Sequence, residues 1–354
     1  MIKDGRLYVS NSLLGDIATC STKAHLAWHS LLKPNGPEGA PLVAGTAVHK
    51  AMEVHFNGGS YDEAMGAFIT SYLPYSEANI IDEKDRLHYD NVKIILRRWL
   101  QENPVEKFPF VPISGFAERT LAHPLNKEGD IWMYGTPDLI AEDRNNRDAL
   151  VVIDNKSTGN IAQWWRNAYW LKSQQIGYSW LTANVLGRAV GMTYVNALQL
   201  DKLPDSVRKC KEHGVPHTEC REYHASWRLL GPFTYTPEAI EEWRLSALHL
   251  AKRYRDLILT YPFTSDLRRV RTQGQFNGGC TFCNFSDFCR AGRPTKALSM
   301  LFQPSTRHED MIKAALTADT VSAERKAKEN YASNDNNGTD EPAPPLEPED
   351  GTGD

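Results

Sequence analysis

The sequence predicts an α/β protein with a helical N-terminal part. Three observations support this class: helical patterns of apolar residues fill most of the first hundred positions, strand-like segments dominate about residues 111–230, and a long helical pattern closes that block. The chain has 354 residues, of which 41% are hydrophobic and 24% charged. Such a chain can bury a sizeable core, which excludes a fibrous fold and disorder along the whole length.

The N-terminal third begins with a short strand, LYVS, and then becomes mostly helical. A first helical pattern is capped by Ser10 or Ser12, includes Cys20 and runs to about Leu32, where a proline-containing segment breaks it. Further helices are expected at residues 43–56, about 61–72 and about 77–101.

Strands dominate the middle of the chain. The run ALVVI in one of them is continuous and apolar, which predicts a strand buried on both faces. A tryptophan-rich helix follows it and ends before Gly187. The expected strands cover residues 111–123, 130–143, 148–158, 191–200 and 219–230, and the expected helices cover about residues 161–186 and 237–259.

Changes in composition divide the chain into five parts. The final 26 residues hold eight acidic residues and no basic one, so the other 328 residues have a formal charge of +4 although the whole chain has −4. A mildly basic body permits an anionic partner, and the acidic tail has too few apolar residues to fold alone. The expected parts are a helical part at 1–110 with Cys20 and His49, an α/β core at 111–262, a cysteine-rich segment at 263–300, a helical extension at 301–328 and a disordered tail at 329–354.

The sequence also bears on location and cofactors. No stretch approaches the roughly 18 consecutive apolar residues of a membrane-spanning helix, and the first residues lack the apolar core of a secretion signal. We therefore expect a cytoplasmic protein without a membrane partner. Six cysteines in a reducing compartment favour metal ligation or core positions over disulfides. The pattern GxxxxGK[ST] of P-loop ATPases does not occur.

Residues that could carry chemistry follow two successive strands. Asp138 stands in GTPDLIAE, and Asp154 and Lys156 stand in VVIDNKST, where positions i and i+2 of a strand project on the same side. Two carboxylates that meet repel one another unless a cation lies between them, and Mg²⁺ or Mn²⁺ suits such oxygen ligands. The alternative is a buried Asp154–Lys156 ion pair with Asp138 in a turn. The similar triplet at 82–84 lies in charged surroundings and carries no such expectation.

These residues resemble the signature of the PD-(D/E)XK nuclease superfamily. The resemblance lies in Pro137–Asp138 followed by Asp154–Asn155–Lys156. Two further motifs are similar to its RecB-like branch, because GTAVHKAME resembles the G-T-x-x-H helix and SQQIGY resembles the Q-x-x-x-Y motif of that branch. The resemblance covers about residues 7–295 and implies a restriction-endonuclease-like α/β core.

The resemblance implies a role for each matching residue. The metal ligands would be His49, Asp138, Asp154 and the backbone carbonyl of Asn155. The remaining site residues would be a catalytic Lys156, with Gln174 and Tyr178 orienting the lysine or the DNA. Gln175 would take the glutamine role if the helix register differed by one. We interpret Glu118, on the preceding strand, as a structural or ion-paired residue, with an additional metal ligand as the alternative.

The cysteines form two groups. Cys280, Cys283 and Cys289 are clustered, whereas Cys20 lies 260 positions before them. This arrangement is similar to the iron-sulfur staple of RecB-like nucleases and implies a [4Fe-4S] cluster that clamps the two ends of the core, with zinc or free thiols as alternatives. A second group, Cys210, His213, His217 and Cys220, has spacings that could close around zinc. An exposed hairpin loop is the interpretation that we favour for it.

Basic and aromatic residues suggest how a nucleic acid would bind. Bases near the clustered cysteines could follow a phosphate backbone, and one or two aromatic residues of the helix at 161–186 could stack on unpaired bases. The bases are Arg268, Arg269, Arg271, Arg290, Arg293 and Lys296, and the aromatic residues are Trp164, Trp165, Tyr169, Trp170 and Trp180.

The resemblance therefore implies a Mg²⁺- or Mn²⁺-dependent DNA exonuclease that acts on single-stranded ends in DNA repair, recombination or CRISPR adaptation. Exonuclease activity follows from the resemblance alone. A helicase, a recombinase or a single-strand-binding protein would be its partner. The alternative is a noncatalytic DNA-binding or partner subunit of a helicase-nuclease or recombination complex, although the intact Asp138, Asp154 and Lys156 argue against it.

Overall fold

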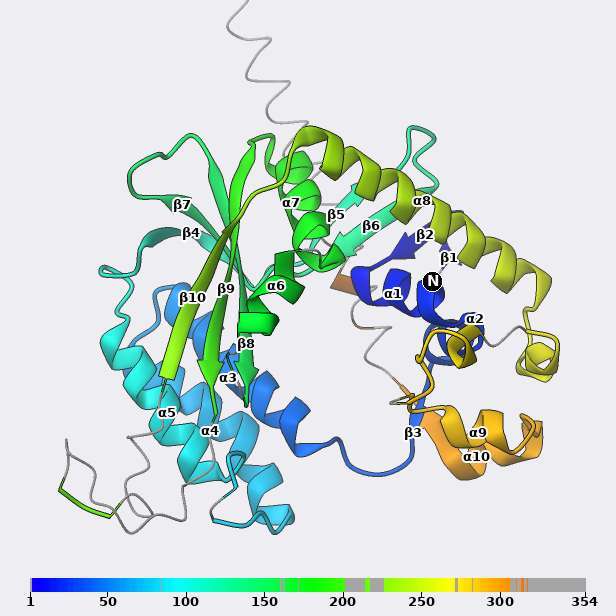
Figure 1. Cartoon of the computed structure of the whole chain (residues 1–354), viewed down its shortest axis with the longest axis horizontal. Helices are drawn as coiled ribbons and strands as arrows, with labels where there is room; N and C mark the ends of the chain where they lie inside the picture. Colours follow the sequence, from blue (N-terminus) through cyan, green and yellow to red (C-terminus); the bar gives the residue numbers. More distant parts are fainter. Residues whose placement is uncertain are drawn as a thin grey trace, which may run out of the picture.

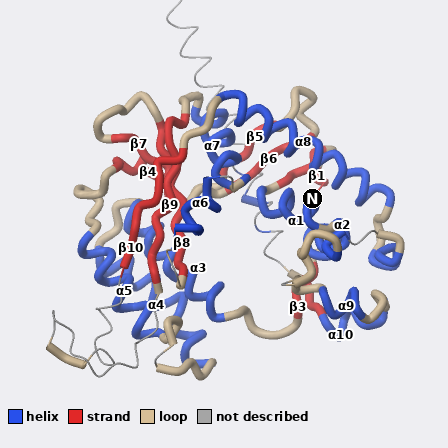
Figure 2. Tube along the Cα trace, in the orientation of Figure 1, coloured by secondary structure: helices blue, strands red, loops and turns tan. Residues whose placement is uncertain are grey.

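Helices surround two main β-sheets in the computed structural model of the chain (Figures 1 and 2). The structure describes residues 2–83, 85–159, 161, 163–170, 172–200, 214–216, 226–270, 273–281 and 283–305, and the single positions 310, 313, 314 and 317. Four predictions concern residues outside these ranges: those on Lys84, on Arg271, on the cysteine and histidine group at 210–220 and on the tail at 329–354. The side chains of Trp164 and Trp165 are outside them as well.

The larger sheet has five strands in the order β10-β9-β8-β7-β4. Strand β8 pairs in parallel with β9 and antiparallel with β7, while β10 and β4 form the antiparallel edges. Residues 150–153 of β8 are all fully buried, which confirms the expectation from the ALVVI run. The strands are β4 Phe110–Ala117, β7 Leu139–Asp143, β8 Leu150–Thr158, β9 Val190–Gln199 and β10 Ser226–Phe233.

Two smaller sheets accompany it. A four-stranded sheet has the order β1-β2-β6-β5, and a two-stranded sheet joins β3 near the N-terminus to β11 near residue 300. The two-stranded sheet thereby connects segments far apart in the sequence. The strands are β1 Ile2–Lys3, β2 Arg6–Val9, β3 Leu32–Pro34, β5 Leu121–Pro124, β6 Ile131–Gly135 and β11 Phe302–Pro304.

Two helical layers enclose the five-stranded sheet (Figure 1). Leu139 and Ala141 of β7 belong to the hydrophobic core formed with α3, α4 and α5, whereas Ile140 belongs to the core formed with α1, α7 and α8. This alternation is what a strand buried on both faces produces. The helices are α1 Asn11–Thr19, α2 Ser21–Ala24, α3 Ala40–Phe56, α4 Tyr61–Ala78, α5 Tyr89–Glu102, α6 Gln163–Trp170, α7 Ser173–Leu186 and α8 Pro237–Thr260.

The C-terminal described segment is built from short elements. They pack against the N-terminal region through Leu26, which shares a small core with Phe285 and Phe288. The expected helical extension at 301–328 is wrong at its start, because Phe302–Pro304 pairs with β3 as a strand. The elements are the short 3₁₀ turns Thr264–Arg268, Gln273–Gln275 and Thr295–Ala297, and the helices α9 Ser286–Arg290 and α10 Leu298–Leu301.

The expected first helix breaks at Cys20. Ser10 caps α1, since its side chain accepts a hydrogen bond from the Leu13 N–H, but Cys20 has an extended backbone with φ −161° and ψ 118°. A new helix starts at Ser21 and continues into a π-helical turn at His25–His29. The break turns the chain at the cysteine, so Cys20 stands between two helices rather than inside one.

Two expected strands are each split between sheets. The segment 111–123 becomes β4 of the larger sheet and β5 of the smaller one, with Glu118 in the left-handed region at φ +52° between them. The segment 130–143 divides in the same way into β6 and β7. The pattern of apolar residues cannot reveal which sheet a strand joins, because strands of both sheets are buried on at least one face and therefore show similar patterns.

Helix boundaries differ from expectation at three places. The helix expected at 77–101 begins at Tyr89, because residues 85–88 form a turn in which the Asp85 side chain accepts from the Leu87 N–H at 2.8 Å. Helix α4 extends to Ala78 instead, with Pro74 inside it. The expected helix at 161–186 is two helices, α6 and α7, and the expected last strand starts at Ser226 within the described residues.

Candidate active site

Asp138 and Asp154 meet at one point of the larger sheet. Leu139 of β7 is in register with Ile153 of β8, so the next antiparallel positions bring these two aspartates opposite one another. Their side chains are 6% and 0% exposed. Lys156, two positions further along β8, places its Nζ 2.6 Å from Oδ1 of Asp154 and 4.0 Å from Oδ2 of Asp138. The ion pair that we considered as the alternative is therefore present, and Asp138 adjoins it.

Asn155 links the two aspartates through its backbone. Its N–H donates to Oδ2 of Asp138 at 2.5 Å. Its side-chain oxygen accepts from the amide of Asn196 at 2.9 Å, since the two asparagines are register partners in β8 and β9 and are both 2% exposed. Nothing in the sequence singles out Asn196, because only the parallel pairing brings it beside Asn155.

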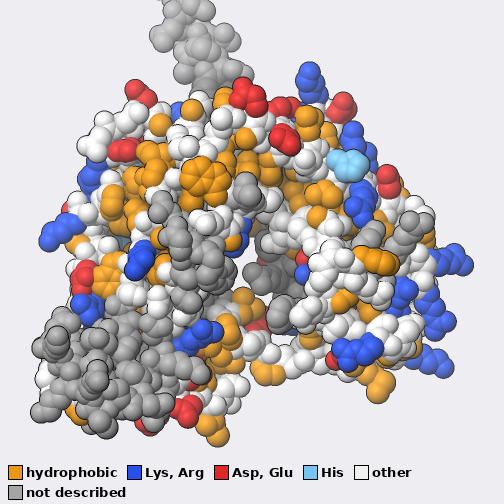
Figure 3. All heavy atoms as spheres, in the orientation of Figure 1, with side chains coloured by type: hydrophobic (Ala, Val, Ile, Leu, Met, Phe, Trp, Pro, Cys, Tyr) orange, Lys and Arg blue, Asp and Glu red, His pale blue; other side chains and the backbone are white. Residues whose placement is uncertain are grey.

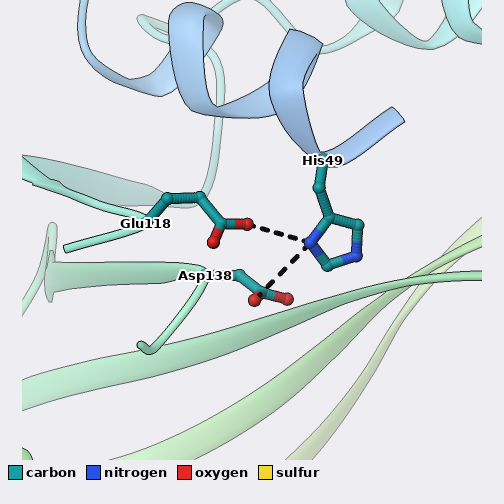
Figure 4. A group of neighbouring side chains, drawn as sticks. All are labelled: His49, Glu118 and Asp138. Carbon is teal, nitrogen blue, oxygen red and sulfur yellow. Dashed lines mark hydrogen bonds and ion pairs between the residues drawn. The ribbon is translucent and has the colours of Figure 1, made fainter. Parts of the chain in front are cut away.

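His49 of α3 and Glu118, just after β4, complete this cluster (Figure 4). Nδ1 of His49 lies 2.9 Å from Oε1 of Glu118 and 3.6 Å from Oδ1 of Asp138. One ligand atom from each of these three described residues lies within 4.8 Å of the other two, which is close enough for all three to bind one metal ion. Glu118 is thus ion-paired, as we interpreted it, and also stands where an additional ligand would.

The glutamine that contacts the aspartates is Gln174. Its Nε2 lies 3.2 Å from Oδ1 of Asp154. Gln175 is fully buried instead, and neither atom of its amide has a hydrogen-bond partner among the described residues. Tyr178 follows one helical turn after Gln174 and packs so closely on Gly135 that a Cβ there would lie 2.8 Å from the tyrosine Cε1. The structure therefore places Gln174, rather than Gln175, beside Asp154, and Tyr178 interacts with Gln174, which favours the register that we expected.

The charges of the cluster perturb one another. Burial raises the pKa of Asp154 to about 6 in spite of Lys156 beside it, and burial also raises the pKa of Asp138. Burial would lower the pKa of His49, but the Glu118 hydrogen bond and the Asp138 charge outweigh it and raise that pKa. The Asp154 and Asp138 charges similarly outweigh burial and raise the pKa of Lys156. A bound cation would favour the ionised form of these buried carboxylates and lower their pKa.

The donor set fits a hard divalent cation. Oδ2 of Asp154 is buried and has no hydrogen-bond partner among the described residues, so this oxygen is available as a ligand for a cation. Asp138, Glu118 and His49 offer further oxygen and imidazole ligands close by. Carboxylate oxygens suit Mg²⁺ and Mn²⁺, which also keep sites for water and substrate. A pocket of about 430 Å³ opens beside this cluster and is lined by His49 and Lys156 among others.

The four cysteines assigned to a cluster also come together. A Cβ added to Gly274 would lie 3.2 Å from Sγ of Cys280 and 3.6 Å from Cβ of Cys20, so the first and second cysteines flank one glycine. Burial raises the pKa of the Cys289 thiol to about 11, and the charges of Cys20, Cys283 and Cys280 act on it too. All four are free thiols.

The basic and aromatic residues that the sequence singled out differ in exposure. Arg268, Arg269, Arg290 and Lys296 are exposed, whereas the guanidinium of Arg293 donates to the Leu267 and Val270 carbonyls at 2.6 Å and is structural. Figure 3 shows Lys and Arg side chains gathered over the part that carries α9 and α10. Tyr169 and Trp180 are buried core residues, and Trp170 is 47% exposed.

The comparison with known proteins agrees with this geometry. The model of the PD-(D/E)XK nuclease superfamily matches residues 8–290. The chain belongs to this superfamily. The match includes every residue of the aspartate, lysine and histidine cluster, and membership implies a nuclease that hydrolyses phosphodiester bonds of a nucleic acid.

Other comparisons add little to the superfamily assignment. A solved structure titled "Crystal structure of SSO0001" aligns with 79% of this chain and 95% of that chain at 15% identity and a TM-score of 0.28, which supports no further conclusion. No curated protein matches the chain. Among the described helices of this superfamily member, none is both long and apolar enough to cross a membrane.

Proposed function

We propose that the protein is a Mg²⁺- or Mn²⁺-dependent deoxyribonuclease of the RecB-like branch that acts as an exonuclease on single-stranded ends. One observation carries the proposal: Asp138, Asp154, Lys156 and His49 form one cluster beside a pocket that His49 and Lys156 line, in a chain that belongs to a nuclease superfamily. Exonuclease action and the preference for single strands are supported by the resemblance of the GTAVHKAME and SQQIGY segments to that branch.

The residues divide into ligands and helpers. Asp138, Asp154, His49 and the carbonyl of Asn155 would hold the cation, with Glu118 as a further oxygen ligand. Mg²⁺ or Mn²⁺, when bound, stabilises the negative charge that develops on the phosphate and favours ionisation of water.

Lys156 supplies a positive charge to the reacting phosphate. Its raised pKa keeps the ammonium protonated, so Nζ donates hydrogen bonds to a phosphate oxygen or to the attacking water. Gln174 donates to Asp154 and holds its carboxylate in one orientation. Tyr178 packs under the site against Gly135, and its hydroxyl lies within reach of Gln174.

We further propose that Cys20, Cys280, Cys283 and Cys289 hold a [4Fe-4S] cluster. The four cysteines lie near one another, because Cys20 and Cys280 flank Gly274 and the charges of Cys20, Cys280 and Cys283 act on Cys289. The resemblance to the iron-sulfur staple of RecB-like nucleases favours a cluster of this kind over a zinc ion. Its role would be structural, because it closes a loop of 260 positions.

The biological setting would be DNA repair, recombination or CRISPR adaptation. The partner would be a helicase, a recombinase or a single-strand-binding protein, in line with the RecB-like resemblance. Superfamily membership implies a nucleic acid substrate. We propose that this nucleic acid is DNA.

Digestion of end-labelled single-stranded and double-stranded DNA in Mg²⁺ and in Mn²⁺ tests the activity. We expect nucleotides to be released one at a time from one end of the single strand. Asp154→Ala should abolish cleavage but retain DNA binding, and Lys156→Ala should lose rate more than metal affinity. Asp82→Ala, in the similar triplet, is the matched control and should leave cleavage unchanged.

Two outcomes would contradict the proposal. Wild-type cleavage rates in both Asp154→Ala and Lys156→Ala would show that the active site is wrong. A wild-type protein that binds DNA but cleaves no substrate with either metal would favour the noncatalytic subunit.

A further inference from the structure

A second lysine lies at the edge of the candidate active site. Lys172 immediately precedes α7, and Gln174, two positions later, contacts Asp154 at 3.2 Å. Lys172 itself is half-buried and interacts electrostatically with both Asp154 and Lys156. Neither the superfamily signature nor the sequence motifs assign this residue a role.

The side chain of Lys172 is held in place by an aromatic ring. Its Nζ lies 3.6 Å from the centroid of the Tyr169 ring, and its backbone N–H donates to the Tyr169 carbonyl at 3.2 Å. Tyr169 is 3% exposed and belongs to a small core with Leu230 and Phe233 of β10. The ring is therefore anchored to the sheet, and it fixes the lysine beside the reacting groups.

No carboxylate neutralises this lysine at close range. Within the described part of the chain, Nζ of Lys172 has no acidic oxygen within the 4.0 Å of an ion pair, whereas Lys156 has two such partners. Burial penalises an isolated charge, and half-burial brings part of that penalty to Lys172. A cation that is held over a ring and has no close carboxylate partner at a site for phosphate chemistry is available for an anion that the protein itself does not supply.

The neighbouring backbone favours the same class of ligand. The first N–H groups of a helix have no intrahelical acceptor and carry a partial positive charge, and α7, with 14 residues, begins at Ser173 beside the lysine.

We propose that Lys172, held over Tyr169, binds a phosphate group of the substrate strand other than the one that is cleaved. This inference rests on the proposed nuclease function. The group is either the internal phosphodiester that flanks the cleavage position or a terminal phosphate, since both present the same oxygens to an ammonium group.

Binding of a fluorescent single strand, measured without divalent cations over a range of salt concentrations, tests the inference apart from cleavage. Lys172→Ala should weaken binding and lower the slope of log affinity against log salt by about 0.7, the value for one lost contact to a single strand. Lys172→Glu should weaken binding further, and Lys172→Arg should restore most of it, because arginine keeps the charge and stacks on a ring.

Lys93→Ala is the matched control. Lys93 also lies over a tyrosine, with Nζ 5.4 Å from the Tyr89 centroid, but it belongs to α5, whose helical neighbours are α3 and α4. This variant should keep the wild-type slope. Equal slopes for wild type and Lys172→Ala, or an equal loss in Lys93→Ala, would overturn the inference.

Strands with a hydroxyl or a phosphate at the 5′ or the 3′ end distinguish the two sources. A Lys172→Ala defect that occurs on all strands identifies the internal phosphate, and a defect confined to one phosphorylated end identifies the terminal group. If Lys172→Ala binds and cleaves every strand like the wild type, the inference fails while the nuclease function stands. A wild-type protein that binds no DNA would overturn both.

Discussion

Nδ1 of His49 lies 2.9 Å from Oε1 of Glu118, although the two residues are 69 positions apart and come from a helix and from the end of a strand. Glu118 reaches the histidine because its backbone adopts φ +52° while its N–H donates to the Asp138 carbonyl at 3.0 Å. A non-glycine residue in this region is uncommon and is held there by its surroundings. The backbone therefore holds the Glu118 carboxylate within the candidate metal site formed with His49 and Asp138.

We expect Glu118→Gln to weaken metal binding. The substitution keeps the size of the side chain but removes its charge from His49 and from the cation. Loss of a residue that orients a metal ligand typically costs about 10–100-fold in affinity or activity. A Mn²⁺ titration of activity and of direct binding measures the change.

Glu53→Gln serves as the control for that prediction. Glu53 lines the same pocket but pairs with Lys50 at 2.7 Å. It should bind Mn²⁺ like the wild type. If Glu118→Gln also kept wild-type affinity, Glu118 would have only a structural role.

Substitutions at the adjacent Gln174 and Gln175 should affect different properties, catalysis at the first and folding stability at the second. Gln174→Ala removes the donor to Asp154 and should lower kcat with little effect on folding. Gln175→Met replaces a fully buried amide that has no hydrogen-bond partner among the described residues, so it should raise the free energy of unfolding by about 1 kcal/mol and leave kcat unchanged. Urea unfolding and steady-state kinetics on both variants check this pair. A kcat defect in Gln175→Met would instead support the shifted register.

Local patterns predict some parts of the site, whereas the distant grouping of His49 with Asp138 and Asp154 came from the family resemblance. Asp154 and Lys156 share one side of a strand because residues two apart always do, and the four-residue step from Gln174 to Tyr178 is one helical turn. The sequence predicts Glu118 as a structural or ion-paired residue, with a metal ligand as the alternative, and it does not single out Asn196. Their partners, His49 and Asn155, are 69 and 41 positions away, and no local pattern encodes such pairings.

In the fold, too, local sequence patterns predict the elements but not the pairing of distant segments. The α/β class and most elements could be predicted because apolar periodicity depends on near neighbours. The division of residues 111–123 and 130–143 between two sheets depends on distant partners. The late start of α5 has a local cause, but it is a polar contact that apolar periodicity does not show. There the Asn91 side chain donates to the Asp85 carbonyl at 2.8 Å and ties the turn to the helix that follows it.

We expect the purified protein to be brown and to contain iron and sulfide. Cys20→Ala and Cys280→Ala should each remove the visible absorption and lower stability, because each removes a ligand from a cluster that joins the two ends of the core. Cys210→Ala should retain the colour, since Cys210 belongs to the other cysteine group. Metal analysis after anaerobic purification provides the measurement, and zinc in place of iron would refute the cluster but not the nuclease.

Folding stability should fall in mild acid because of His25. Burial lowers the pKa of His25, whose Nε2 lies 2.6 Å from the Tyr261 carbonyl and whose Nδ1 lies 3.2 Å from the Ser30 hydroxyl. These contacts fit the neutral ring, in which Nε2–H donates to the carbonyl and Nδ1 accepts from the hydroxyl. A histidine with a depressed folded pKa contributes stability above its unfolded pKa of about 6.5 and loses it as the pH falls through the folded value.

His25→Gln tests this dependence, because glutamine can still donate to the Tyr261 carbonyl but does not titrate. The wild type should lose more of its free energy of unfolding than His25→Gln between pH 7.5 and pH 5, in urea titrations at both values. His249→Gln, at an exposed position of α8, should follow the wild type. An equal loss in His25→Gln and wild type would show that other groups, such as the buried His55, whose pKa burial also lowers, dominate the acid sensitivity.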